Sequence, residues 1–239
     1  MAVVTISGRI GAPARAVGLE VARGLGAEYV DYQILIEASK RAGASVADVA
    51  QKDERVARGR ERISKVIQRF IERSAAAGSA GDPLLGPTGV EVLMSRSFAE
   101  AARTPQDRAG QLDDERYIGI MTTVLKEMGA AGNAVIIGRG SNIVLKDLPG
   151  AVHTWLVTAL PARTKEIMRR ERLSESDAQK YIKNEEEGRA AYYKKFFKVA
   201  ADDPNYYDLF LNTDRLGVDR CAQLIVAATR MAAPVPALA

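Results

Sequence analysis

The sequence predicts an α/β protein with a three-layer α/β/α architecture, in which helices cover both faces of a parallel central sheet. Apolar, β-branched runs at residues 3–6, 135–137 and 152–157 are typical of buried strands. Each run is followed by a turn and then by a helical pattern of apolar residues. Because strands that alternate with helices form parallel sheets, we expect the polar turns to lie at the ends of the strands.

Composition and charge are those of an ordinary soluble domain. Of the 239 residues, 47% are hydrophobic and 27% are charged, and the net charge of +4 suits an anionic ligand without marking a nucleic-acid-binding protein. The one cysteine, Cys221, excludes an internal disulfide and fits a reducing cytoplasm, and the one histidine, His153, argues against a histidine metal site. No apolar run is long enough to span a bilayer. We therefore expect a single cytoplasmic domain over residues 1–239, with no membrane contact and no metal held by protein side chains.

The loop after the first strand has the geometry of a phosphate-binding turn. Backbone N–H groups at the start of a helix, here expected over Ala14–Leu25, have no intrahelical partner and lie at the positive end of the helix dipole. The side chains depart from the Walker A motif, because Pro13, Ala14 and Arg15 stand where glycine, lysine and a hydroxyl residue are required. A βα turn that binds no nucleotide is the alternative. The candidate phosphate-binding residues are Gly8, Arg9, Ile10, Gly11, Ala12, Ala14, Arg15 and Ala16.

Two further polar residues end predicted strands. Asp31 closes a short strand at residues 27–31, and Arg139 follows the strand at residues 135–137. Ligands of open α/β sheets bind at the carboxyl ends of strands, so both residues are candidates for a ligand site beside the first loop. An arginine there can bind phosphate or carboxylate with two parallel hydrogen bonds. Asp31 could equally cap the helix predicted over residues 32–42.

The middle of the chain carries weaker signals. Residues 53–73 predict an amphipathic helix whose basic face is most simply solvated, although some of its arginines could hold a substrate phosphate. The same face lacks the interleaved aromatic residues that nucleic-acid binding uses, so nucleic acid is disfavoured as a partner. Residues 75–89, rich in glycine and proline, predict a functional or mobile loop. A helix over residues 113–128 could serve the core or a homodimer.

A basic helical hairpin is predicted near the C-terminal end. A helix over residues 162–172 precedes a second helix, for which Ser174 is the expected N-cap, with Asp177 completing a capping box. Two basic helices above a phosphate loop could supply charge to a phosphoryl-transfer reaction as a lid, and an incidental solvated hairpin is the equal alternative. A last strand over residues 208–213 and a closing helix over residues 218–231 complete the chain.

The order of these parts resembles the cytidylate kinase-like family, which are relatives of the P-loop nucleoside monophosphate kinases. Cytidylate kinases carry lysine at the Ala14 position and threonine at the Ala16 position, and they have Gly-Arg-Asp where this chain has Gly-Arg-Gly at residues 138–140. Little matches over about residues 45–130, which we treat as an insertion. The resemblance is carried by residues 4–7, Gly11, Arg15, Gly18, residues 25–26, Asp31, and residues 136–140, 163–173, 189–193, 203–204, 207–209, 211–213 and 216–217.

The resemblance implies a P-loop kinase-like fold with a helical lid at about residues 162–205. It implies transfer of the γ-phosphoryl group of ATP to a nucleoside monophosphate or another small anionic acceptor, with Mg²⁺ bridging the phosphates. Asp31 and Arg139 are implied on the acceptor side. The alternative function is a catalytically impaired protein that senses or scaffolds through a bound nucleotide or anion. The catalytic candidates are Arg15, which could replace the missing lysine, and the lid residues Arg169, Arg170, Arg172 and Arg189.

Overall fold

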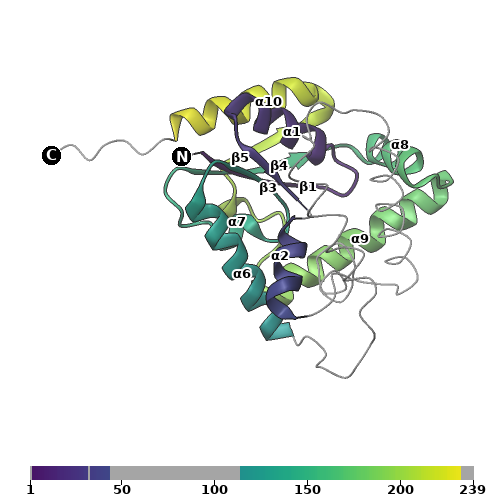
Figure 1. Cartoon of the computed structure of the whole chain (residues 1–239). Helices are drawn as coiled ribbons and strands as arrows, with labels where there is room; N and C mark the ends of the chain where they lie inside the picture. The colour runs from purple at the N-terminus through teal and green to yellow at the C-terminus, as the bar shows by residue number, and fades with distance from the viewer. Residues whose placement is uncertain (1, 32, 44–113, 233–239) are drawn as a thin grey trace, which may run out of the picture.

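A computed structural model describes residues 2–31, 33–43 and 114–232 of the chain. Their core is a parallel five-stranded sheet with the strand order β2-β3-β1-β4-β5 (Figure 1). The strands are β1 Val3–Gly8, β2 Glu28–Val30, β3 Ala134–Ile137, β4 Ala151–Val157 and β5 Leu209–Asn212. The helices are α1 Ala14–Leu25, α2 Gln33–Ala42, α6 Asp114–Ala131, α7 Ser141–Val144, α8 Leu160–Glu171, α9 Glu175–Phe196 and α10 Thr213–Met231, with a 3₁₀ turn at Pro204–Tyr206.

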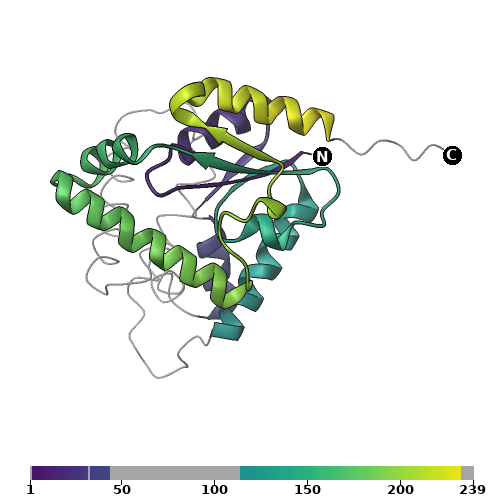
Figure 2. The same cartoon turned by 180° about the vertical axis from the view of Figure 1, so that it is seen from behind.

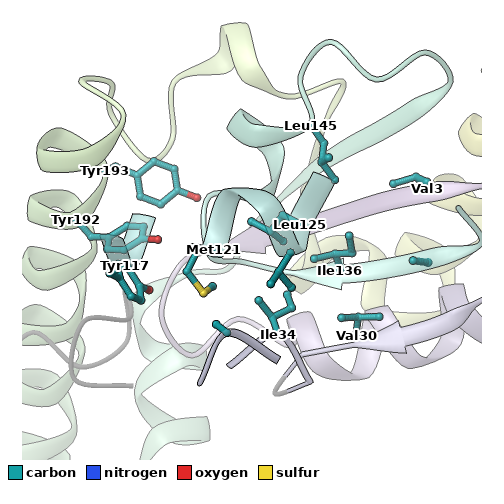
Figure 3. Close-up of a cluster of buried hydrophobic side chains, with 13 residues drawn as sticks. Val3, Val30, Ile34, Tyr117, Met121, Leu125, Ile136, Leu145, Tyr192 and Tyr193 are labelled. Atoms are coloured by element: carbon teal, nitrogen blue, oxygen red, sulfur yellow. The ribbon is translucent and has the colours of Figure 1, made fainter. Parts of the chain in front are cut away.

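The helices form one layer on each face of the sheet, which confirms the three-layer prediction. Alternate residues of a strand point to opposite faces, so Val4 and Ile6 of β1 pack with Val17 of α1 and Ile225 of α10. On the other face Val3 belongs to a second buried cluster. That cluster includes Val30, Ile34, Tyr117, Met121, Leu125, Ile136, Leu145, Tyr192 and Tyr193, drawn from β2, β3, α2, α6, α9 and the chain after α7 (Figure 3).

Helices α8 and α9 form a hairpin at the carboxyl edge of the sheet. Seen from behind, α9 runs from α8 toward α6 (Figure 2). The far end of α9 is anchored in the second cluster, where the rings of Tyr192 and Tyr117 each lie within 6 Å of the ring of Phe196. The hairpin therefore extends from the strand ends to the helix layer on one face.

The predicted elements are found at nearly the predicted positions where the structure describes them. Helix α1 has the predicted bounds, and Ser174 caps α9 by accepting a hydrogen bond from the Asp177 amide at 3.2 Å. The closing helix differs: it starts at Thr213 rather than residue 218, because the Asn212 side chain caps two amides there. Gly217, at φ 74° and ψ 173°, then interrupts the helix. The predictions for residues 53–73 and 75–89 lie outside the described residues.

None of the helices in the described ranges combines the length and apolar character that crossing a membrane requires.

The sequence's one histidine lies inside the sheet, as expected for a strand residue. His153 of β4 is 6% exposed, and its Nδ1 lies 2.8 Å from the hydroxyl oxygen of Thr5 on β1. Burial lowers the pKa of His153 below its ordinary value of 6.5, and this outweighs the carboxylate of Asp208 and the backbone of Leu145, which act in the opposite direction.

We expect the free energy of unfolding to decrease as the pH falls below about 6.5. The unfolded chain binds a proton at His153 that the folded chain excludes, so the stabilisation is complete above the ordinary pKa and is lost toward the lower folded pKa. Urea unfolding between about pH 5.5 and pH 7.5 measures the slope, and His153→Gln should flatten it. An unchanged slope in that variant would contradict the assignment.

Candidate functional site

The loop between β1 and α1 leaves backbone amides without protein partners. The amides of Arg9, Ala12 and Ala14 bond to carbonyls at distances from 2.9 to 3.1 Å. In residues 2–31, 33–43 and 114–232 the amides of Gly11, Arg15 and Ala16 have no such partner. The start of α1 has neither a side-chain cap nor an acidic residue in its first turn. This loop can therefore accept an anion on backbone donors alone.

Two glycines are required by the path of the loop itself. A Cβ atom on Gly8 would lie 2.8 Å from the Leu156 carbonyl oxygen of β4. Gly11 has φ +87°, and a Cβ atom there would lie 2.9 Å from the Cβ atom of Arg163. Both glycines are among the candidate phosphate-binding residues, and the structure adds that the loop must pass close to β4 and α8 at these positions.

Asp31 and Arg139, the two residues assigned to the acceptor side, form a buried ion pair. The Arg139 Nη1 atom donates to Asp31 Oδ1 at 2.9 Å and to the Ile137 carbonyl at 3.2 Å. Arg139 is fully buried and Asp31 is 6% exposed. The pairing follows from the sheet, because Val30 of β2 stands opposite Ile136 of β3 and both strands end at the next turn. The guanidinium thus lies at the strand edge, one strand away from the phosphate loop.

Two buried polar residues beside Arg139 were not among the predicted site residues. Ser141 and Asn142 are fully buried, and the Tyr193 hydroxyl of α9 donates to Asn142 Oδ1 at 3.1 Å. Within the described part of the chain, Ser141 Oγ and Asn142 Nδ2 have no hydrogen-bond partner. The polar run after a strictly apolar strand, residues 138–142, was the sequence signal that could have identified them.

The basic hairpin reaches the loop through fewer arginines than predicted. Arg189 of α9 donates to the Gly8 carbonyl oxygen, so this candidate does lie at the phosphate loop. Arg169 and Arg170 instead bond to Glu166 and Glu171 of their own helix. Arg172 ends α8 in a left-handed conformation, and among the described residues none of these three contacts the loop.

Two other contacts between this region and the loop were not predicted. Arg163, at the start of α8, is 8% exposed and donates to the Ile10 carbonyl at 3.1 Å. Arg9 forms an ion pair with Asp202, beyond α9, at 3.0 Å. The sequence contains all these charges, but it carries no local signal of contacts that span more than 150 residues.

Two side chains of the loop lack the oxygen atoms that a metal ligand needs. Ala14 and Ala16 have no side-chain oxygen to coordinate Mg²⁺. Across the described ranges no group of three or more histidine, cysteine, aspartate or glutamate side chains could hold a metal ion.

We expect Asp31→Asn to lower the free energy of unfolding by about 3–5 kcal/mol, because it removes the charge of one partner of a buried ion pair. Asp202→Asn is the matched control: its ion pair with Arg9 is exposed, and its loss should cost less than about 1 kcal/mol. Urea unfolding of both variants measures the difference. Similar losses in the two would show that the Asp31–Arg139 pair has no special role in stability.

Comparison with known proteins agrees with this architecture. A cytidylate kinase of Methanoculleus marisnigri is 31% identical over 104 residues, which are 43% of this chain and 56% of that kinase, so the chain matches little more than half the length of this relative. The crystal structure of an uncharacterized protein from Eubacterium ventriosum shares the fold, with a TM-score of 0.60 at 16% identity, over 96% of this chain and 98% of that one.

A shikimate kinase from Acinetobacter baumannii, solved in complex with shikimate, has a TM-score of 0.45 at 14% identity, over 97% of this chain and 94% of that one. The sequence model of the cytidylate kinase-like family matches residues 3–215 of this chain. With that match over most of its length, the chain belongs to the cytidylate kinase-like family.

Proposed function

We propose that the protein transfers the γ-phosphoryl group of ATP to a nucleoside monophosphate, such as cytidylate, or to a similar small anionic acceptor. The observation that carries the proposal is the buried Arg139–Asp31 pair, which lies at the ends of β3 and β2 beside the phosphate loop that follows β1. Donor and acceptor phosphates could thus meet at neighbouring strand ends. Family membership supports phosphoryl transfer of the nucleotide-kinase type.

At the ATP site, backbone amides and an arginine of the hairpin would bind the phosphates, in place of the lysine and hydroxyl side chains of a Walker A loop. The amides of Gly11, Arg15 and Ala16 are available to ATP phosphates. The Arg189 guanidinium, held against the Gly8 carbonyl, brings a positive charge to the loop where Ala14 has none. Charge supplied by an arginine of this kind stabilises the transferring phosphoryl group.

ATP and Mg²⁺ are the cofactors that this family implies. The free amides of the loop fit the phosphates of ATP, whereas the loop lacks the hydroxyl that holds Mg²⁺ in a Walker A motif. We therefore assign no catalytic step to Mg²⁺ on residues of this loop.

The second candidate function is nucleotide or anion binding without phosphoryl transfer. The observation that favours it is the contrast within the loop: three of its amides have no backbone partner among the described residues, while Ala14 and Ala16 lack the side chains that act on the phosphates. A sensing or scaffolding protein would keep the first feature and tolerate loss of the second.

We expect the purified protein to convert ATP to ADP when a nucleoside monophosphate is present. A coupled assay with ATP, Mg²⁺ and each common nucleoside monophosphate measures the reaction, and calorimetry measures ATP binding. Binding without a phosphorylated product from any acceptor would establish the second candidate. Absence of both binding and product would exclude both functions.

We expect Arg189→Gln to lower kcat by about 10³-fold, since the variant removes the hairpin charge nearest the Gly8 carbonyl. Arg230→Gln is the control, because Arg230 also donates to a backbone carbonyl, that of Gly24, but at the opposite end of α1. The same coupled assay compares the two. A loss of less than about threefold in Arg189→Gln would remove this arginine from the mechanism.

A further inference from the structure

We propose that Arg163 is a positioning residue that fixes the direction of the phosphate-binding amides and couples the loop to α9 through Glu186. The expected effect on phosphate binding rests on the proposed function. The expected effect on the conformation of the loop does not depend on it.

The Arg163 guanidinium joins three separate parts of the chain. Its Nε atom donates to the Thr158 carbonyl just after β4 at 3.0 Å, and its Nη1 atom donates to the Ile10 carbonyl of the loop at 3.1 Å. The same Nη1 atom donates to Glu186 Oε1 of α9 at 2.8 Å. The side chain is 9% exposed, so these bonds form with little competition from water. The loop, the end of β4 and α9 are therefore held by one rigid planar group.

Holding the Ile10 carbonyl also sets the direction of the next amide. In a planar trans peptide group, the carbonyl oxygen and the following N–H point in opposite directions. The Gly11 N–H therefore points away from Arg163, on the side of the loop where it has no partner among the described residues. The Gly8–Arg9 peptide group, which lies two peptide groups earlier, obeys the same rule: Arg189 holds the Gly8 carbonyl, and the Arg9 amide bonds to the Leu156 carbonyl at 3.1 Å.

The loop also rests directly on the backbone of α8 at this residue. A Cβ atom on Gly11 would lie 3.0 Å from the Arg163 carbonyl oxygen and 2.9 Å from its Cβ atom. Side-chain hydrogen bonds and backbone contact thus act on the same two loop residues, Ile10 and Gly11. Movement of α8 would be transmitted to the amides without an intervening flexible group.

Glu186 extends this coupling to α9. Glu186 and Arg189 are three residues apart on one helix and so share a face, and each has a contact at the loop end of the sheet. An arginine suits this role better than a lysine, since its fixed fork of donors can bond Thr158, Ile10 and Glu186 at once.

The test compares Arg163→Gln, Arg163→Lys and the control Arg230→Gln in the full chain. Hydrogen exchange in a peptide that contains residues 9–16 reports loop conformation without any ligand, and calorimetry with inorganic pyrophosphate reports phosphate binding. We expect both Arg163 variants to speed exchange in this peptide and to weaken pyrophosphate binding about tenfold, with Arg230→Gln unchanged. Circular dichroism verifies that each variant folds.

The Arg163→Lys variant shows whether Arg163 acts by its fixed hydrogen-bond geometry or only by its positive charge. It keeps the positive charge but not the fork, so full recovery of slow exchange and of binding in Arg163→Lys would overturn the proposal. Unchanged exchange in Arg163→Gln would overturn it as well. If the glutamine variant does not fold, Glu186→Gln replaces it, with faster exchange in residues 9–16 expected and unchanged exchange contradicting the coupling. A wild-type protein that binds no pyrophosphate would count against the proposed function, and the exchange measurement would still decide the role of Arg163.

Discussion

A parallel sheet imposes the constraint on which every feature of this site depends: all of its strands end at the same edge. The phosphate loop follows β1, Asp31 follows β2, Arg139 follows β3 and Thr158 follows β4. Groups separated by more than 100 residues in the chain therefore meet without any local sequence preference for one another. The N–H groups at the start of α1 lie at the same edge, where the positive end of the helix dipole favours negative charge.

Several guanidinium groups lie at this edge, and four of them are held by acceptors from distant parts of the chain. Arg139 is paired with Asp31, and Arg9 with Asp202. Arg163 has one carboxylate and two carbonyls, whereas the bond that Arg189 makes to the loop goes to a carbonyl, which does not neutralise its charge. The positive charge of Arg189 therefore favours an anionic ligand at the loop.

Local patterns were sufficient to predict the sheet, its flanking helices and the loop, because hydrophobic periodicity and capping act within a few residues. Strand ends also predicted that Asp31 and Arg139 lie beside the loop, but not that the two side chains bond to each other. The family resemblance selected the lid arginines by their position in the sequence, which does not show where a side chain points: Arg169 is 75% exposed and bonds within its own helix. The role of Arg163 was not predicted because its partner Ile10 is 153 residues away in the sequence, and the two residues meet only in the folded chain.

The loop lacks the Walker lysine, and the positive charge beside it comes from arginines of the hairpin instead. A Walker lysine is part of the loop itself, so its position does not depend on the hairpin. Arg163 and Arg189 reach the Ile10 and Gly8 carbonyls only while α8 and α9 lie against the loop. On the proposed function, the positive charge at the donor site therefore depends on the position of the hairpin. Preorganised charge of this kind stabilises a transferring phosphoryl group most strongly where water is excluded.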